Sequence, residues 1–259
     1  MFSTATVNYH VKSPYSQAFY FDTNGDVGKL VSPELLSSQV QVQDIRRGDL
    51  TVNFEDNGIT FESHTSQIVS FSKTTGWQET YNNELTALLS EKIGATEVII
   101  FDHTVRRDSK NAIRRPARNV HNDYSPEGAK QRLVDLVGTK RAVEISKGHY
   151  AFVNLWRPIE GPIKTAPLGF IHPDSVSPDD WLEIALVYPD RQGHILGVTA
   201  NHQHHWFYMS LMTPQDIVIF NVYDNQGKPY LAHGAMDLGN ETGTTQPRIS
   251  LETRTLILF

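Results

Sequence analysis

Short apolar runs, separated by turn-forming residues, recur along most of this chain. The runs are rich in Val, Ile, Phe and Tyr, and clusters of Gly, Pro, Asn and Asp lie between them. This spacing is typical of an all-β sandwich or barrel. A further segment, 52–61, is interrupted by Asn57-Gly58 and predicts a hairpin with a tight turn. The other predicted strands lie near residues 98–101, 150–156, 182–188, 206–211, 217–223 and 248–259.

Two segments carry the marks of helices instead. Asn82 or Asn83 can cap a helix with a leucine-rich face, and Gly94 would end it. Ser125, followed by a proline, would begin a second helix that Gly138 stops. The sequence contains no internal repeat, linker or low-complexity segment, so we expect one compact β domain with flanking helices.

Composition excludes several kinds of site. The chain has 259 residues and a net charge of -6, which argues against nucleic-acid binding. Its one dense basic cluster, residues 113–118, is better explained as a solvated loop than as a site that attracts an acidic substrate. No segment has the length and apolarity needed to cross a membrane, and the first 20 residues do not resemble a signal peptide. We therefore expect a soluble cytoplasmic protein.

The absence of cysteine narrows the choice of metal ligands to His, Asp and Glu. His121 and Asp123 stand one residue apart, and residues at this spacing on a strand point to the same face. His233 follows far downstream. Two imidazoles and one carboxylate are the ligand set that holds a non-haem iron while leaving coordination positions open for a co-substrate and dioxygen.

The same spacing occurs a second time, at His172 and Asp174. Periodicity alone does not choose between the two pairs. Asp174 has a competing local role, because it stands in a segment with turn and helix-start chemistry, and we therefore favour the His121 pair. Three more histidines crowd at residues 202–205 with no carboxylate close by in sequence, which favours exposed imidazoles at a strand edge or loop.

The last predicted strand offers an acid-binding pair. Arg248 and Ser250 share one face of it, so a guanidinium and a hydroxyl can bind one carboxylate together. The planar fork of arginine matches a carboxylate in a bidentate way. Arg254 lies six residues on, roughly 20 Å along an extended strand, and cannot reach the same group. This pair would suit the far carboxylate of a keto acid that chelates the iron.

Five segments taken together resemble a known family. They are residues 120–123, 154–158, 205–208, 232–235 and 248–254. The combination resembles the hydroxylase/desaturase family typified by the fungal asaB enzymes and the cephem-methoxylase-related oxygenases. The resemblance extends from about residue 95 to the end. The chain departs from the family pattern in the residues before His233 and in the loop at residues 239–243.

This resemblance implies a double-stranded β-helix, the cupin-like jelly roll, with a few flanking helices. From the length and organisation of the chain we expect one domain over residues 1–259, in which residues 1–94 supply amino-terminal strands and a helix and residues 95–259 form the jelly-roll core. The family's ligand roles carry over to the matching positions. His121, Asp123 and His233 become the Fe(II) ligands, and Arg248 and Ser250 become the residues that bind the co-substrate 2-oxoglutarate.

The expected activity is hydroxylation or desaturation of a small molecule, secondary-metabolite-like or derived from an amino acid, with dioxygen. Trp156, Arg157 and Tyr208 are candidates for substrate contacts, although buried packing is the favoured role of the two aromatic residues. Two alternatives stay open: a cupin-type dioxygenase or isomerase that needs no 2-oxoglutarate, and a non-catalytic jelly-roll binding protein. Neither needs the Arg248 and Ser250 pair. The sequence also leaves a homodimer open.

Overall fold

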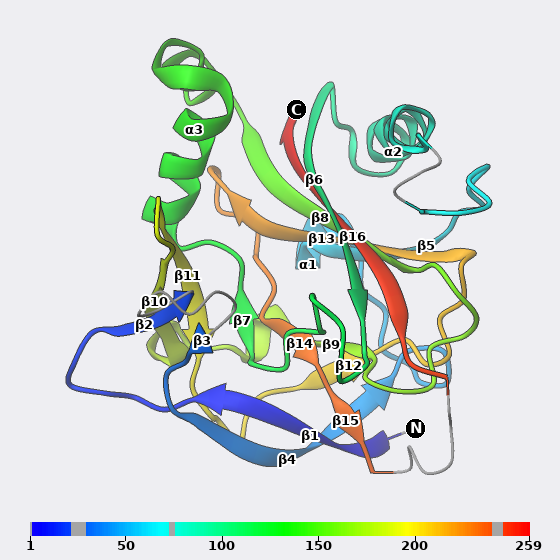
Figure 1. Ribbon diagram of the computed structural model, residues 1–259, viewed down its shortest axis with the longest axis vertical. Coiled ribbons are helices and arrows are strands. Elements are labelled where there is room, and N and C mark those ends of the chain that lie inside the picture. Colours follow the sequence, from blue (N-terminus) through cyan, green and yellow to red (C-terminus); the bar gives the residue numbers. More distant parts are fainter. Residues whose placement is uncertain (1, 22–29, 73–75, 240–245) are drawn as a thin grey trace.

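The computed structural model describes residues 2–21, 30–72, 76–239 and 246–259. Within this part the protein is mainly β, with an eleven-stranded and a five-stranded sheet that pack face to face (Figure 1). The larger sheet has the order β15-β1-β4-β12-β9-β14-β7-β11-β10-β2-β3, and the smaller has the order β5-β13-β8-β16-β6. The strands are β1 (Phe2–His10), β2 (Gln17–Phe21), β3 (Leu30–Val31), β4 (Leu35–Asp44), β5 (Ile59–Ser63), β6 (Glu97–Arg107), β7 (His121–Asn122), β8 (Tyr150–Pro158), β9 (Leu168–Ile171), β10 (Trp181–Val187), β11 (Gln192–Val198), β12 (Trp206–Tyr208), β13 (Asp216–Asp224), β14 (His233–Ala235), β15 (Asp237–Leu238) and β16 (Ile249–Leu258).

The space between the sheets is filled by large aromatic side chains. Phe170 and Phe207 of the larger sheet meet Phe152 and Phe220 of the smaller one, and all four are fully buried. The rings of Phe170 and Phe220 lie 5.1 Å apart in an edge-to-face arrangement. Burying one such side chain stabilises the fold by about 1.5–3 kcal/mol. This packing fixes the distance between the sheets and therefore the width of the space that holds the candidate site.

The amino-terminal strands belong to the same sheet as the later ones. β1 pairs with β4 and with β15, and β4 pairs in turn with β12. Residues on both sides of position 94 thus build one sheet, which supports the prediction of a single domain. None of the helices in the described residues is long and apolar enough to cross a membrane.

Helix α2 (Gln78–Ile93) covers the outer face of the smaller sheet (Figure 1). It ends at Gly94, which has a φ of 75°, as the sequence predicts. Its start is five or six residues earlier than predicted, because the cap lies at Trp77 and not at Asn82 or Asn83. Trp77 takes the capping position without a side-chain cap, and its ring packs 5.7 Å from that of Tyr81. Burial of these two aromatic residues therefore decides where the helix begins, rather than the capping chemistry of Asn82 or Asn83.

Helix α3 (Pro126–Ile145) begins as predicted, because the Ser125 hydroxyl accepts a hydrogen bond from the Gly128 amide at 3.1 Å. The predicted stop at Gly138 is confirmed in part. Gly138 has a φ of 77° and interrupts the helical geometry, but the chain resumes its helix to Ile145. Ala142 and Ile145 are buried in the core between the sheets. Their burial explains why a glycine that could end the helix forms a kink instead.

The predicted hairpin at residues 52–61 is wrong as well. Residues 54–57 form the short helix α1 (Phe54–Asn57), and only the part from Ile59 onward is a strand. Asn53 caps this helix by accepting a hydrogen bond from the Asp56 amide at 2.8 Å, and Gly58 ends it with a φ of 70°. Asn and Gly therefore serve as helix caps here and not as turn residues.

Two short 3-10 helices, η2 (Pro173–Ser175) and η3 (Pro178–Asp180), lie where the sequence predicts turn and helix-start chemistry.

Candidate active site

The three predicted metal ligands converge at one end of the space between the sheets. His121 and His233 begin the adjacent strands β7 and β14 and stand directly opposite each other, with ring centroids 4.5 Å apart. Asp123 follows β7, and its Oδ1 lies 3.5 Å from His121 Nε2. One ligand atom from each residue lies within 4.8 Å of the others. This is the only such group of three found in the described part of the chain.

Both imidazoles are oriented by a backbone carbonyl. His121 Nδ1 donates to the carbonyl of Asn119 at 2.8 Å, and His233 Nδ1 donates to that of Leu231 at 2.9 Å. A carbonyl can only accept, so Nδ1 carries the proton and Nε2 keeps its lone pair for a metal. Burial, helped by the neighbouring His121, lowers the pKa of His233 to about 4. The ring of His233 is therefore neutral at pH 7, the form that binds a cation.

Asp123 is held in place through one oxygen. Its Oδ2 accepts from Asn154 Nδ2 at 2.7 Å and from Arg254 Nε at 3.2 Å. Burial alone would raise the pKa of Asp123, but the Arg254 guanidinium and the two histidines hold it well below its usual range. The carboxylate is thus ionised, and Oδ1 remains for a metal. Two imidazoles and one carboxylate fit Fe(II).

The register of the smaller sheet organises the rest of the site. On β16, Arg254 stands opposite Asn154 of β8 and Asp102 of β6, and Ser250 stands opposite Arg106 of β6. Directly opposed residues on antiparallel strands project from the same face. This inner face therefore presents a row of polar side chains that runs from the neighbourhood of Asp123 toward Arg248.

Arg248 lies at the other end of this row. It is 3% exposed, and its Nε donates to Ser250 Oγ at 3.2 Å while Nη1 donates to the carbonyl of Ala166. Its Cζ lies 4.8 Å from the ring centroid of Trp156. Burial lowers the pKa of Arg248 to about 9, so it is still a cation at pH 7. Within the described residues no carboxylate forms an ion pair with it, and an unpaired buried cation is costly. Such a group indicates a site for an anion.

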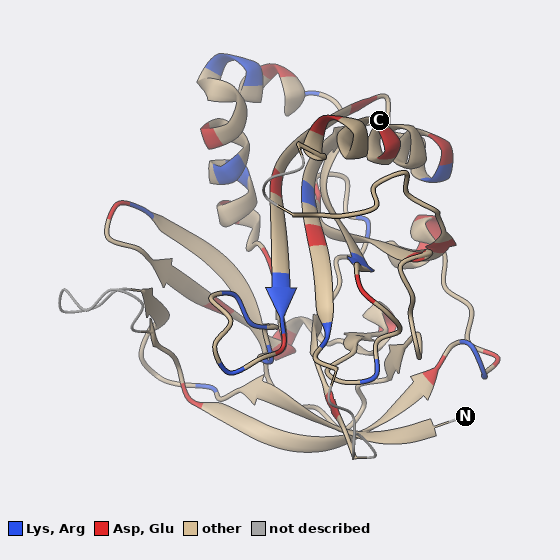
Figure 2. Ribbon diagram, turned by 45° about the vertical axis from the view of Figure 1, so that its right-hand side comes forward, with Lys and Arg blue, Asp and Glu red and all other residues tan. Residues whose placement is uncertain are grey.

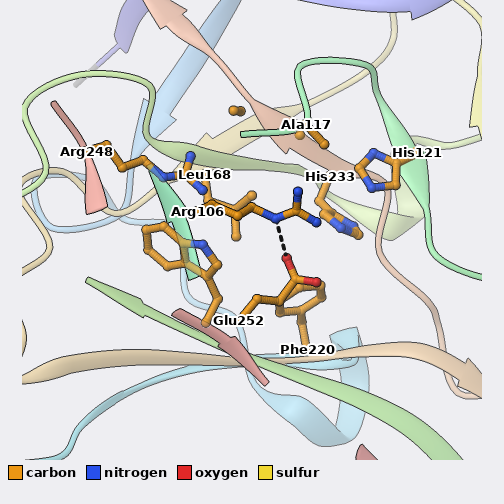
Figure 3. A pocket seen from close by; sticks show the side chains of 11 residues that line it. Arg106, Ala117, His121, Leu168, Phe220, His233, Arg248 and Glu252 are labelled. Atoms are coloured by element: carbon orange, nitrogen blue, oxygen red, sulfur yellow. Dashed lines mark hydrogen bonds and ion pairs between the residues drawn. The ribbon is translucent and has the colours of Figure 1, made fainter. Parts of the chain in front are cut away.

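One small pocket joins the two ends. His121 and His233 lie on one side of it and Arg248 lies on the other (Figure 3). Trp156, which packs against the Arg248 guanidinium, also lines it. The space between these residues, about 320 Å³ in all, is partly open to solvent. The two predicted histidine ligands and Arg248 therefore line the same cavity. Asp123 adjoins His121, and Ser250 accepts from Arg248, but neither lines the cavity itself.

The site and fold can be compared with known proteins. A family model described as "Oxidoreductase/YMDC permease-like domain" matches residues 7–258, nearly the whole chain. The chain belongs to this family. Among its curated relatives is the hydroxylase/desaturase efuI of Hormonema carpetanum, 27% identical over 250 residues, which cover 85% of this chain and 83% of that protein. The alpha-ketoglutarate-dependent dioxygenase phiK of a fungal species is 29% identical over 241 residues, 85% of this chain and 83% of that protein. The resemblance to the hydroxylase/desaturase family is confirmed.

A solved structure of the iron and alpha-ketoglutarate-dependent endoperoxidase NvfI has the same fold. It superposes with a TM-score of 0.86 and 20% sequence identity, over 99% of this chain and 98% of that one. The cupin-like jelly roll predicted for this family member is therefore confirmed. The loop at residues 240–243, where the sequence departs from the family pattern, lies outside the described residues.

Of the three candidates for substrate contacts, only Trp156 lines the pocket. Neighbouring residues on β8 face opposite ways, so Arg157 points to the outer face, where it donates to the carbonyl of His64 at 2.8 Å. Tyr208 packs with Val42 in a separate cluster, while its neighbour Phe207 faces the core. Strand alternation thus removes Arg157 and Tyr208 from the site.

The other histidines have different surroundings. His172 Nδ1 lies 3.8 Å from Asp174, whose side chain is 82% exposed, and the described residues bring no third ligand to them. The prediction that the imidazoles at residues 202–205 are exposed is wrong for His204, whose side chain is only 1% exposed. It lies between Asp180 at 3.1 Å and the Tyr9 hydroxyl at 2.9 Å. Both partners are distant in sequence, so no local pattern reveals them.

The hydrogen bond from Asn154 to Asp123 leads to a prediction. We expect Asn154→Leu to raise the dissociation constant for Fe(II) about 10–100-fold, because the ligating carboxylate loses a donor that orients it. Anaerobic titration with Fe(II) measures this. The matched control is Asn221→Leu, since Asn221 is equally buried but donates to the carbonyl of Pro229, away from the site. The control should lower the melting temperature and leave metal affinity unchanged; equal metal affinities in both variants would contradict the role of Asn154.

Proposed function

We propose that this protein is an Fe(II)- and 2-oxoglutarate-dependent oxygenase that hydroxylates or desaturates a small molecule with dioxygen. One observation supports the proposal most: the two histidines of a metal-binding triad line the same pocket as Arg248, a buried cation that lacks a carboxylate partner among the described residues. A metal enzyme without a keto-acid co-substrate needs only the triad. A binding protein needs neither feature.

Each residue of the site has a proposed role in binding the metal, binding the co-substrate or excluding water. His121, Asp123 and His233 would hold Fe(II), which supplies the chemistry that activates dioxygen when it is bound. Arg248 and Ser250 would bind the far carboxylate of 2-oxoglutarate and so aim its keto-acid end at the metal. Trp156 keeps the guanidinium in place by stacking on it. Buried Phe220, also in the pocket wall, helps to exclude water.

The substrate class follows from the relatives. Their names include hydroxylase/desaturase, dioxygenase and, for NvfI, endoperoxidase, so one fold supports several oxidative outcomes. We propose a secondary-metabolite-like or amino-acid-derived substrate for this chain. A single domain over residues 1–259, a cytoplasmic location and a homodimer remain predictions, and we propose no nucleic-acid or membrane partner.

Spectroscopy and product analysis test the proposal. With Fe(II) and 2-oxoglutarate under anaerobic conditions, the protein should show the weak visible charge-transfer band of a chelated keto acid. In air, a screen of small acids, amino acids and polyketide- or peptide-derived metabolites should identify compounds that stimulate succinate release. Iron binding without the band would favour the enzyme that needs no keto acid. Absence of iron binding would favour the non-catalytic jelly roll.

A further inference from the structure

A second arginine enters the same pocket. Arg106 stands at the end of β6, opposite Ser250, and its side chain lines the pocket together with Arg248 and the two histidines. In Figure 3 its guanidinium lies between Arg248 and His233. The proposed function assigns no role to this residue, although its side chain is 17% exposed and carries a charge into a cavity built for an acid.

The Arg106 guanidinium has one nitrogen without a hydrogen-bond partner among the described residues. Arg106 Nε donates to Glu252 Oε2 at 3.3 Å, and Nη1 donates to the carbonyl of Arg115 at 3.1 Å. These two bonds fix the plane of the guanidinium. Nη2 has no hydrogen-bond partner within the described residues, so this oriented guanidinium keeps one donor group for a ligand.

Glu252 does not neutralise Arg106 completely, because it is shared between two arginines. This carboxylate also pairs with Arg254 through its other oxygen, Oε1. Both cations hold the pKa of Glu252 below its usual value, although burial opposes them. Glu252 therefore works as a buried support that positions two arginines, one directed to Asp123 and one directed to the pocket.

The loop after β6 adds further positive charge at this edge of the pocket. Figure 2 shows Lys and Arg at the carboxyl end of β6 and along the loop that follows it. The same loop supplies Ala117 to the pocket wall, and Arg114 and Arg115 are exposed on it. This edge of the pocket therefore carries exposed cations although the chain as a whole is acidic.

We propose that Arg106 binds the carboxylate next to the keto group of the co-substrate. An arginine of the pocket would then bind each of the two carboxylates of the dicarboxylic acid. This inference rests on the proposed function, in which Arg248 and Ser250 hold the far carboxylate. Arg106 lies nearer the histidines than that anchor does (Figure 3), and it is therefore placed for the carboxylate that meets the metal. It acts as a specificity residue, because a keto compound with a neutral group in this position would lose the interaction.

The test compares two ligands of nearly equal shape. Glutarate has two carboxylates, whereas glutaramate has one carboxylate and one neutral amide. Calorimetric titration of the Mn(II)-loaded protein gives the two dissociation constants and needs no turnover. Hydrogen bonds to a charged group contribute about 1.5–3 kcal/mol, so we expect Arg106→Gln to reduce the preference for glutarate by about tenfold or more. Arg107→Gln removes the same charge from an exposed neighbour outside this pocket and should leave the preference unchanged.

Two further variants separate the possible explanations. In Arg106→Gln/Glu252→Gln the pocket keeps its net charge, so the same loss of preference must persist if Arg106 contacts the ligand. An unchanged preference in both Arg106 variants would overturn the inference. Arg248→Met tests the proposed function independently, because it should weaken glutarate binding. If Arg248→Met weakens binding while the Arg106 variants bind like the wild type, the proposed function stands and only this inference fails.

Discussion

Replacing His121 or His233 with alanine is expected to abolish the anaerobic charge-transfer band, whereas His172→Ala should leave it intact. The band requires iron and the keto acid to be bound together. Each of the first two variants removes an imidazole whose Nε2 is aimed at the metal position by a carbonyl on Nδ1. Two remaining protein ligands hold Fe(II) too weakly for the complex to accumulate. An absorption spectrum recorded at saturating 2-oxoglutarate is the measurement.

His172 is the matched control because it shares the His-x-Asp spacing with His121. Each variant also loses a partly or fully buried ring, so thermal unfolding should be measured beside the spectrum. A folded His121→Ala protein without the band supports the assignment. Loss of the band in His172→Ala and its persistence in His121→Ala would show that the other pair binds the iron.

Sequence periodicity predicted the parts of the site that depend on one strand. His121 with Asp123, and Arg248 with Ser250, share a face because alternate residues on a strand do so. The cap at Ser125 and the glycine at position 94 are likewise local, and the structure has both. In each case the interaction involves residues a few positions apart, and the pattern in the sequence contains the information.

Local sequence patterns could not predict contacts between segments that lie far apart in the chain. The alternation on the last strand placed Arg254 on the inner face, but only the pairing of β16 with β8 brings it and Asn154 to Asp123. The helix at residues 54–57 was missed for a related reason. Asn57-Gly58 fits a hairpin turn or a helix end equally well, and the packing of Phe54 beneath α2 belongs to the tertiary structure.

Arg248→Met is expected to raise the dissociation constant for 2-oxoglutarate by about 100-fold or more. Arg248 offers charge-assisted hydrogen bonds to the far carboxylate, and two such bonds contribute about 3 kcal/mol at the low end. Methionine is unbranched and uncharged, and it reaches only about as far as Nε of the arginine, so it removes the guanidinium and keeps an apolar side chain in the same place. Anaerobic titration of the charge-transfer band measures the constant. Thermal stability should not fall, because the variant removes a buried cation that has no carboxylate partner among the described residues.

A ligand without the far carboxylate provides the control for this variant. 2-Oxobutyrate has the same keto-acid head but cannot contact Arg248 through a second carboxylate. Wild type should bind it weakly, and Arg248→Met should change that affinity by no more than about threefold, since the lost interaction never formed. If Arg248→Met weakens both keto acids to the same extent, the arginine supports the metal centre or the fold rather than the far carboxylate. The buried guanidinium would then need another anion, and the case for a keto-acid co-substrate would lose its main structural support.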